Sequence, residues 1–123
     1  MVNRIIGIPL ENGILCPHFG HCQEFAIVKI NNKTITDITT EIPPEHVPGL
    51  YPKWIIQFGV TDVIAGGMGE KAIDLFNQQN INVFLGAPLK TPQELVNDFI
   101  NNKLKLNANY CDKESHRHGN CGQ

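Results

Sequence analysis

Short apolar runs separated by polar turns predict strands in the first part of the chain. Runs of this kind lie at residues 4–9, 25–30 and 34–40, and their β-branched and aromatic residues favour extended structure. Asn31 and Asn32 suit the tight turn of a hairpin between the second and third runs, because asparagine tolerates a left-handed backbone. We therefore expect the first three strands to form an antiparallel meander.

The second part of the chain changes to helical periodicity between short buried strands. A proline-rich connector at residues 42–49 precedes apolar residues at helical spacing from Leu50 to Phe58. Strands are predicted at residues 62–65 and 82–86, and each is followed by a helical pattern. Alternation of strands and helices predicts parallel pairing through right-handed crossovers.

Two further helices complete the predicted domain. One begins after the Gly-Gly-Met-Gly turn at residues 66–69, and the other begins at a capping box formed by Thr91 and Glu94. We predict one α/β domain over residues 1–106, with helices packed on a mixed five-stranded sheet. Strands one to three of this sheet are antiparallel, and strands one, four and five are parallel. Residues 107–123 carry no apolar periodicity and are predicted to form a flexible tail.

The composition and the net charge limit the classes of molecule that this protein is expected to bind. Of the 123 residues, 41% are hydrophobic and 18% charged, which suits one folded domain. The net charge of -2 offers no basic excess for nucleic acid or an anionic membrane. No signal peptide is recognisable, and no run approaches the ~18 apolar residues of a membrane span. We therefore expect a cytoplasmic protein that binds neither nucleic acid nor membranes.

Four metal-binding side chains fall within seven residues of a predicted loop: Cys16, His18, His21 and Cys22. Thiolates and imidazoles are ligands for iron–sulfur species, zinc and copper. Two cysteines are fewer than the four that usually hold an iron–sulfur cluster, which favours an open site where a preformed cluster docks and leaves. The alternative is that the histidines form ordinary loop hydrogen bonds and the cysteines pack as small hydrophobic residues.

The tail carries a second group of metal-ligand side chains: Cys111, His116, His118 and Cys121. Short tracts rich in cysteine and histidine often bind metal, so this group is a candidate zinc site or a set of ligands that folds over the loop. The alternative is a solvated tail without a ligand. In a cytoplasmic protein, four cysteines more often indicate metal binding, redox chemistry or plain packing than structural disulfides.

The glycine-rich turn is the third candidate site. Gly67, Met68 and Gly69 follow a predicted strand and open a helix, where backbone amides can hold an anion such as a metallocluster. The spacing is close to a dinucleotide fingerprint, but no acidic residue follows the next strand to bind a ribose. The alternative is an ordinary tight turn with Met68 in the core.

The order of these motifs resembles the dinitrogenase iron–molybdenum cofactor biosynthesis family. The resemblance covers residues 3–106 and is carried by the His-Phe-Gly-His loop at residues 18–21, by residues 24–25, and by the strand and glycine turn at residues 63–69. The family includes small cofactor carriers of nitrogenase assembly and the C-terminal domain of the cofactor maturase. The resemblance implies a ribonuclease H-like fold and binding of iron–sulfur or iron–molybdenum species. Two features depart from the family pattern, namely the loop cysteines and the Cys/His tail.

These observations predict a non-catalytic protein that binds or carries an iron–sulfur or iron–molybdenum-type cofactor for metalloprotein assembly. No arrangement of nucleophile, base and acid stands out in the sequence, so we do not expect an enzyme. The expected partner is a protein that donates or accepts the cofactor, and its client is nitrogenase or another metalloprotein. Two alternatives are a metal- or redox-sensing interaction module that uses the tail, and a small enzyme that binds a nucleotide at the glycine turn.

Overall fold

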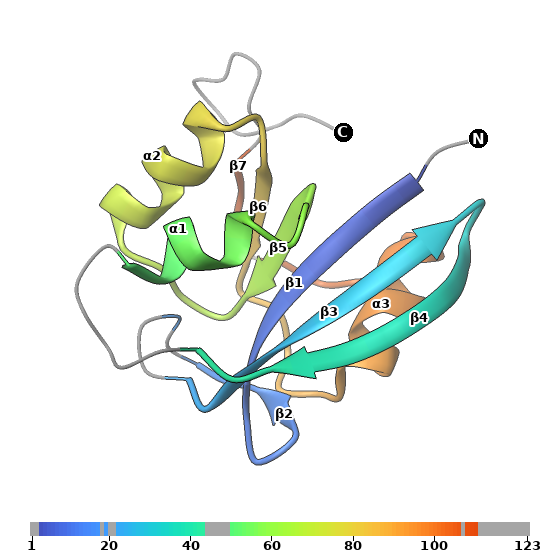
Figure 1. Cartoon of the computed structure of the whole chain (residues 1–123). Coiled ribbons are helices and arrows are strands. Elements are labelled where there is room, and N and C mark those ends of the chain that lie inside the picture. Colours follow the sequence, from blue (N-terminus) through green and yellow to red (C-terminus); the bar gives the residue numbers. More distant parts are fainter. Residues whose placement is uncertain (1–2, 18, 20–21, 44–49, 107, 111–123) are drawn as a thin grey trace.

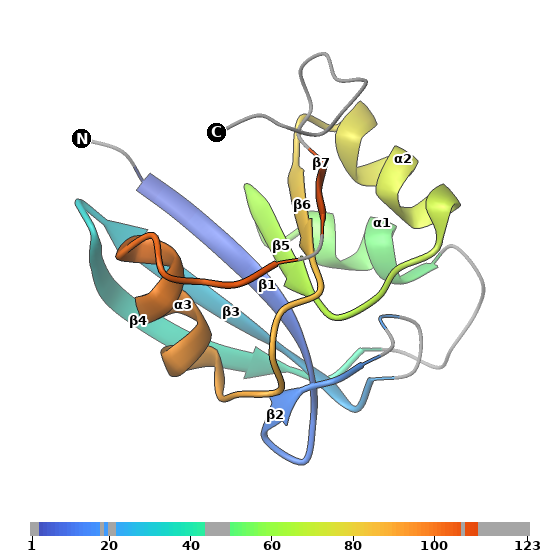
Figure 2. The same ribbon diagram turned by 180° about the vertical axis from the view of Figure 1, so that it is seen from behind.

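The computed structural model of the chain has a central mixed sheet between two layers of helices (Figure 1). It describes residues 3–17, 19, 22–43, 50–106 and 108–110. Helices α1 (Leu50–Ile56) and α2 (Glu70–Gln78) cover one face of the sheet, and α3 (Pro92–Ile100) covers the other face (Figure 2). Among the described residues, no helix is long and apolar enough to span a bilayer.

Within the described residues the sheet has seven strands, which are β1 (Asn3–Glu11), β2 (Ile14–Leu15), β3 (Glu24–Asn31), β4 (Thr34–Glu41), β5 (Asp62–Ala65), β6 (Asn82–Leu85) and β7 (Ala108–Tyr110). Six of them follow the order β4-β3-β1-β5-β6-β7, and β2 pairs with β1 beside this path. Strands β1, β3 and β4 are antiparallel neighbours, whereas β1, β5 and β6 are parallel. The predicted antiparallel meander and parallel second half are therefore confirmed.

The predicted number of five strands is wrong, because two short strands join the sheet. Strand β2 is two residues long and forms a hairpin with β1. Strand β7 lies in the segment predicted to be a flexible tail, and it pairs antiparallel with β6. Such short strands are defined by hydrogen bonding to a neighbour rather than by an apolar period of their own.

The alternation of side chains along β3 builds a core on each face of the sheet. Phe25 and Ile27 point to the layer of α1 and α2, whereas Ala26, Val28 and Ile30 point to α3. The helices complete the two cores with Ile55, Ile73 and Phe76 on one face, and with Leu95 and Val96 on the other. The predicted capping box at the start of α3 is confirmed.

A buried carboxylate joins the three parallel strands near their amino-terminal ends. Asp62 of β5 is 0% exposed and accepts hydrogen bonds from Arg4 Nη1 at 2.9 Å, Thr61 Oγ1 at 2.6 Å and Asn82 Nδ2 at 2.9 Å. Arg4 belongs to β1 and Asn82 to β6. This polar cluster lies at the end of the sheet opposite the predicted Cys/His loop.

Candidate functional site

The loop between β2 and β3 lies at the carboxyl ends of the parallel strands. Two backbone hydrogen bonds hold its ends against β1. The Cys16 N–H donates to the Pro9 carbonyl oxygen at 2.9 Å, and the Gln23 N–H donates to the Leu10 carbonyl oxygen at 2.8 Å. Because consecutive carbonyl groups point to opposite sides of a strand, the loop passes over the end of β1 from one side to the other.

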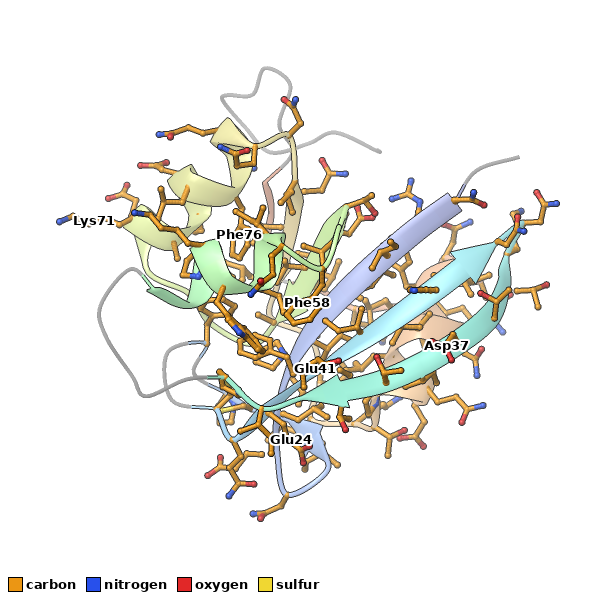
Figure 3. The ribbon with its side chains drawn as sticks, viewed as in Figure 1. Glu24, Asp37, Glu41, Phe58, Lys71 and Phe76 are labelled. Atoms are coloured by element: carbon orange, nitrogen blue, oxygen red, sulfur yellow. The ribbon has the colours of Figure 1, made fainter. Side chains whose placement is uncertain are left out.

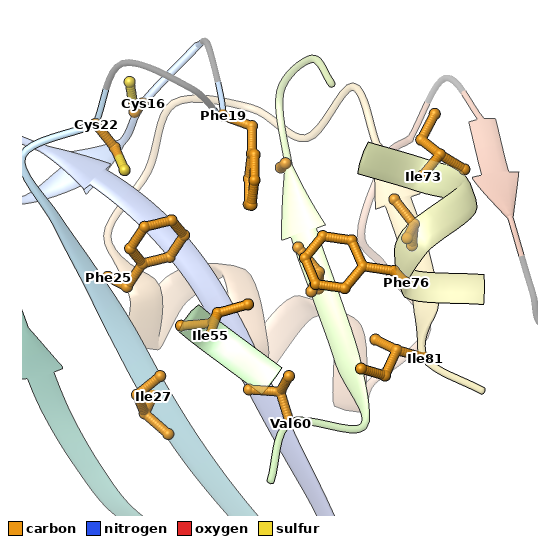
Figure 4. Close-up of a cluster of buried hydrophobic side chains, with 13 residues drawn as sticks. Cys16, Phe19, Cys22, Phe25, Ile27, Ile55, Val60, Ile73, Phe76 and Ile81 are labelled. Carbon is orange, nitrogen blue, oxygen red and sulfur yellow. The ribbon is translucent and has the colours of Figure 1, made fainter. Parts of the chain in front are cut away.

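Both loop cysteines are buried in the core beneath α1 and α2. Cys16 is 1% exposed and Cys22 is 8% exposed, and both are thiols rather than members of a disulfide. Phe19 points into the same cluster (Figure 4), where its ring packs edge-on against Phe25 and Phe76 at centroid distances of 5.5 and 5.7 Å. Phe19 therefore anchors the middle of the loop, and the two thiols lie in the same buried cluster.

The surroundings of Cys22 favour the protonated form of its thiol. Burial, followed by the electrostatic effect of the nearby Cys16 sulfur, raises the pKa of Cys22 from 9.0 to about 12. The Cys16 thiol donates a hydrogen bond to Glu11 Oε1 at 3.9 Å. A metal that binds these sulfurs must therefore displace a proton, as metal binding to thiols generally does.

The loop and the glycine-rich turn, predicted separately, form one continuous surface. The Phe19 N–H donates to the Gly67 carbonyl oxygen at 3.2 Å. A Cβ atom at Gly66 would lie 3.2 Å from both Cα and the carbonyl oxygen of Pro17, and one at Gly67 would lie 3.3 Å from that oxygen. A Cβ at either glycine would therefore push against the backbone of Pro17, which would have to shift by a few tenths of an ångström. The Gly86 N–H, which donates to Gly66 at 2.9 Å, ties the turn to the end of β6.

The remaining residues of the turn have different surroundings. Met68 is partly buried and packs against the core, which agrees with its alternative role as a core residue. Gly69 is the N-cap of α2 and has open space around its Cα, and no side chain caps the first turn of this helix. The amides that begin α2 therefore lie beside the surface formed by the loop and the turn.

Several predicted ligands lie outside the described residues. They are His18, His21, Cys111, His116, His118 and Cys121. Within the ranges that the structure does describe, no three side chains of His, Cys, Asp or Glu gather into a metal site. Tyr110, just before the tail cysteine, pairs with Val83, and β7 runs away from the end of the sheet that holds the loop.

Glu11 belongs to the site and was missed in the sequence. Positive φ values of 56° at Asn12 and 85° at Gly13 make the turn that follows Glu11 a two-residue hairpin. Glu11 then pairs with Ile14, so that Cys16, two residues further, lies on the same face as Glu11. The Asn-Gly pair after a strand was the signal that would have identified this contact.

One protein-family profile and one relative match most of the sequence of this chain. The sequence profile of the family described as "Dinitrogenase iron-molybdenum cofactor" matches residues 3–102. A protein of Methanocaldococcus jannaschii named as uncharacterized is 32% identical over 105 residues, which are 81% of this chain and 88% of the relative.

Solved structures share the fold. The crystal structure of PH0822 has a TM-score of 0.75 and 29% sequence identity, and the match covers 84% of this chain and 94% of that one. The apo form of the orange protein from Desulfovibrio gigas has a TM-score of 0.70 over 85% of this chain and 93% of that one. Its 16% identity supports the likeness of fold alone.

Proposed function

The chain belongs to the dinitrogenase iron–molybdenum cofactor family, and we propose that it binds and carries a preformed iron–sulfur or iron–molybdenum-type cluster. The cluster is cargo for the assembly of a metalloprotein, and the protein performs no catalytic step on it. The partner in this proposal is a protein that donates the cluster or accepts it. The ribonuclease H-like classification, the cytoplasmic location and zinc binding by the tail remain predictions from the sequence.

The contact between the loop and the glycine-rich turn carries this proposal. The hydrogen bond from Phe19 to Gly67 supports a single site in which sulfur and imidazole ligands lie next to backbone amides. Thiolates and imidazoles bind iron, and amides at the start of a helix stabilise the negative charge of a cluster. Neither set suffices alone, since the loop holds only Cys16 and Cys22 as sulfur ligands.

Incomplete ligation suits a carrier better than a resident metalloprotein. Four cysteines usually hold an iron–sulfur cluster, and the loop provides two. The raised pKa of Cys22 adds a further cost, because its proton must leave when sulfur binds iron. Both features weaken binding, and weak binding is what a protein needs in order to release its cargo to another.

The test is an anaerobic transfer experiment with two matched variants. Apo protein is mixed with a reconstituted iron–sulfur cluster and desalted, and iron and sulfide are counted per chain. One variant replaces the loop histidines (His18→Ala and His21→Ala), and its control replaces the two tail histidines (His116→Ala and His118→Ala). We expect the native chain and the tail variant to retain iron and sulfide in fixed proportion, and the loop variant to lose both.

Other outcomes would decide against the proposal. Equal retention by the loop variant and the native chain would reject the loop as the site. Loss confined to the tail variant would instead support a metal-sensing module that uses the tail. Far-ultraviolet circular dichroism of each variant separates loss of binding from loss of fold.

A further inference from the structure

Strand β4 forms one edge of the sheet and is exposed over most of its length. It has β3 on one side, and among the described residues no strand lies on its other side. Six of its eight residues are exposed. Because the backbone groups of an antiparallel strand point alternately to its two sides, about half of those of β4 point away from β3. This edge is therefore suited to main-chain pairing with a further strand.

The sequence of β4 lacks most of the features that protect an exposed sheet edge. Natural edges are short, or they carry lysine, proline or a β-bulge that hinders pairing with another chain. Strand β4 has eight residues, and residues 34–41 include neither lysine nor proline. The register shift opposite Lys29 and Ile30 lies near the hairpin and leaves residues 37–41 in regular register. The threonines and isoleucines of this strand favour extended structure, so the edge stays open to pairing.

Ile38 gives this edge an apolar centre. It pairs with Val28 of β3, which is buried in the core beneath α3, so the Ile38 side chain lies on the same face of the sheet. Ile35 packs against that core, whereas Ile38 is 39% exposed. A strand placed beside β4 would cover Ile38 and extend this core across the edge.

We propose that β4 pairs antiparallel with β4 of a second copy of this chain, about a two-fold axis at Ile38. In this register Ile38 lies opposite Ile38 of the second copy, and Asp37 lies opposite Thr39. An apolar residue thus meets an apolar residue on the face of α3, and a carboxylate meets a hydroxyl on the other face. The result is one continuous sheet through both copies.

The two carboxylates of β4 disfavour the neighbouring registers. Asp37 and Glu41 extend along the strand (Figure 3), and both lie on the face of α1 and α2. An axis at Asp37 would set two copies of this carboxylate against each other, and an axis at Thr39 would set Asp37 against Glu41. Like charges directly opposite destabilise a strand pair. With the axis at Ile38 the two Asp37 side chains are diagonal, and each pairs with Lys29 of its own β3.

This pairing leaves the candidate site open in both copies. The Glu41 end of β4 pairs with Phe25, at the end of the sheet that carries the loop. Because the two β4 strands run in opposite directions, the two loops lie at opposite ends of the joined sheet. A single pair of strands buries less surface than the roughly 1,200–2,000 Å² of stable complexes, so we expect a weak dimer whose population rises with concentration.

The test is the oligomeric state of the full apo chain, measured by sedimentation velocity over a wide concentration range in the presence of a reductant. One variant carries Ile38→Lys, which places two ammonium groups at the axis. Its control carries Leu89→Lys, the same change at an apolar residue that is 54% exposed and lies outside β4. We expect the native chain and the control to dimerise alike, and Ile38→Lys to raise the dissociation constant by at least about tenfold through like-charge repulsion.

Distances between spin labels test the register. Labels are attached to Ile38→Cys or Glu41→Cys in a chain with Cys111→Ser and Cys121→Ser, so that the other cysteines are the buried pair of the loop. The two labelled backbones lie about 5 Å apart at Ile38, and about 20 Å apart at Glu41, where six residues separate them along the pair. We therefore expect strong dipolar broadening of the electron paramagnetic resonance spectrum only for the label at Ile38.

Other outcomes would overturn the proposal. A native chain that is monomeric at every concentration would reject the dimer. Equal dissociation constants of the Ile38→Lys and Leu89→Lys variants, with unchanged melting temperatures, would place any dimer contact outside β4. Stronger broadening at Glu41 than at Ile38 would reject the register. Amides of β4 that exchange slowly in a monomeric full chain and rapidly in a chain ending at Tyr110 would assign the edge to residues 111–123 instead.

Discussion

Gly66 is the residue on which the contact between the loop and the glycine-rich turn depends. A Cβ at this position would lie 3.2 Å from backbone atoms of Pro17, which cannot move aside as a flexible side chain can. We expect Gly66→Ala to displace the loop and to lower the iron retained per chain in the anaerobic assay. Gly69→Ala is the control, because no atom lies within 4 Å of its added Cβ. Equal loss of iron in both variants would show that close approach at Gly66 is not the cause.

Because of Cys22, the free energy of unfolding depends on pH in the alkaline range. Its pKa is about 12 in the folded chain against 9.0 ordinarily, so the unfolded chain loses this proton first as pH rises. The folded state then binds more protons than the unfolded state, and the free energy of unfolding falls from about pH 9 toward pH 12. Urea denaturation of the native chain and Cys22→Ala should show this difference. A parallel decline in the two proteins would contradict it.

The residue types of the site could be predicted, but their surroundings could not. The sequence identified Cys16 and Cys22 as metal ligands or as small buried residues, and the two interpretations differ only in burial. The two cysteines share their buried cluster with Phe19, whose ring packs against residues of β3 and α2 far along the chain. A side chain that is fixed by such distant contacts leaves no local pattern in the sequence.

At the scale of elements, the strongly patterned segments were predicted and the shortest were not. The helix that begins at Thr91 was predicted from its capping box, and the box is present. The hairpin between β3 and β4 was also predicted, although its left-handed residues are Asn32 and Lys33 rather than Asn31 and Asn32. Strand β7 has three residues, and their extended conformation depends on the exposed edge of β6.

The pairing of β7 with β6 predicts an effect of shortening the chain. A chain that ends at Leu106 lacks β7, and the backbone groups of β6 that pair with it become exposed at the sheet edge. We expect this chain to melt several degrees lower and to lose hydrogen-exchange protection at residues 83–85. A chain that ends at Tyr110 keeps β7 and is the control for removal of residues 111–123. Equal melting temperatures of the two chains would contradict a stabilising role of β7.

At the scale of the whole molecule, the buried polar cluster and the candidate site lie at opposite ends of the sheet. Asp62 is fully buried in the polar cluster at one end, and the loop lies at the other. We expect Arg4→Met to lower the free energy of unfolding by about 1–3 kcal/mol, because it removes a charged hydrogen bond from a buried carboxylate. Urea denaturation measures this loss. Iron retention should remain unchanged, and a parallel loss of iron would show that the two ends are coupled.

The location of the candidate site follows from topology that the sequence did predict. Parallel strands in an α/β sheet present their carboxyl ends at one edge, where ligands of such folds usually bind. Strands β1 and β5 were predicted to be parallel. The glycine-rich turn follows the carboxyl end of β5, and the loop, which follows β2, is held against the carboxyl end of β1. The distance between the two motifs in space could not be predicted, because it depends on the Gly66–Pro17 approach and on the packing of Phe19.

The direction of β7 has a consequence for how this fold can be used as a module. The described chain begins at Asn3, beside Asn31, and its last strand ends at Tyr110, beside Val83. Both positions lie at the end of the sheet away from the loop (Figure 1). A second domain fused to either position, or a surface to which the chain is tethered there, would leave the loop unobstructed. The same geometry would therefore suit a natural fusion to a second domain and the attachment of the protein to an electrode.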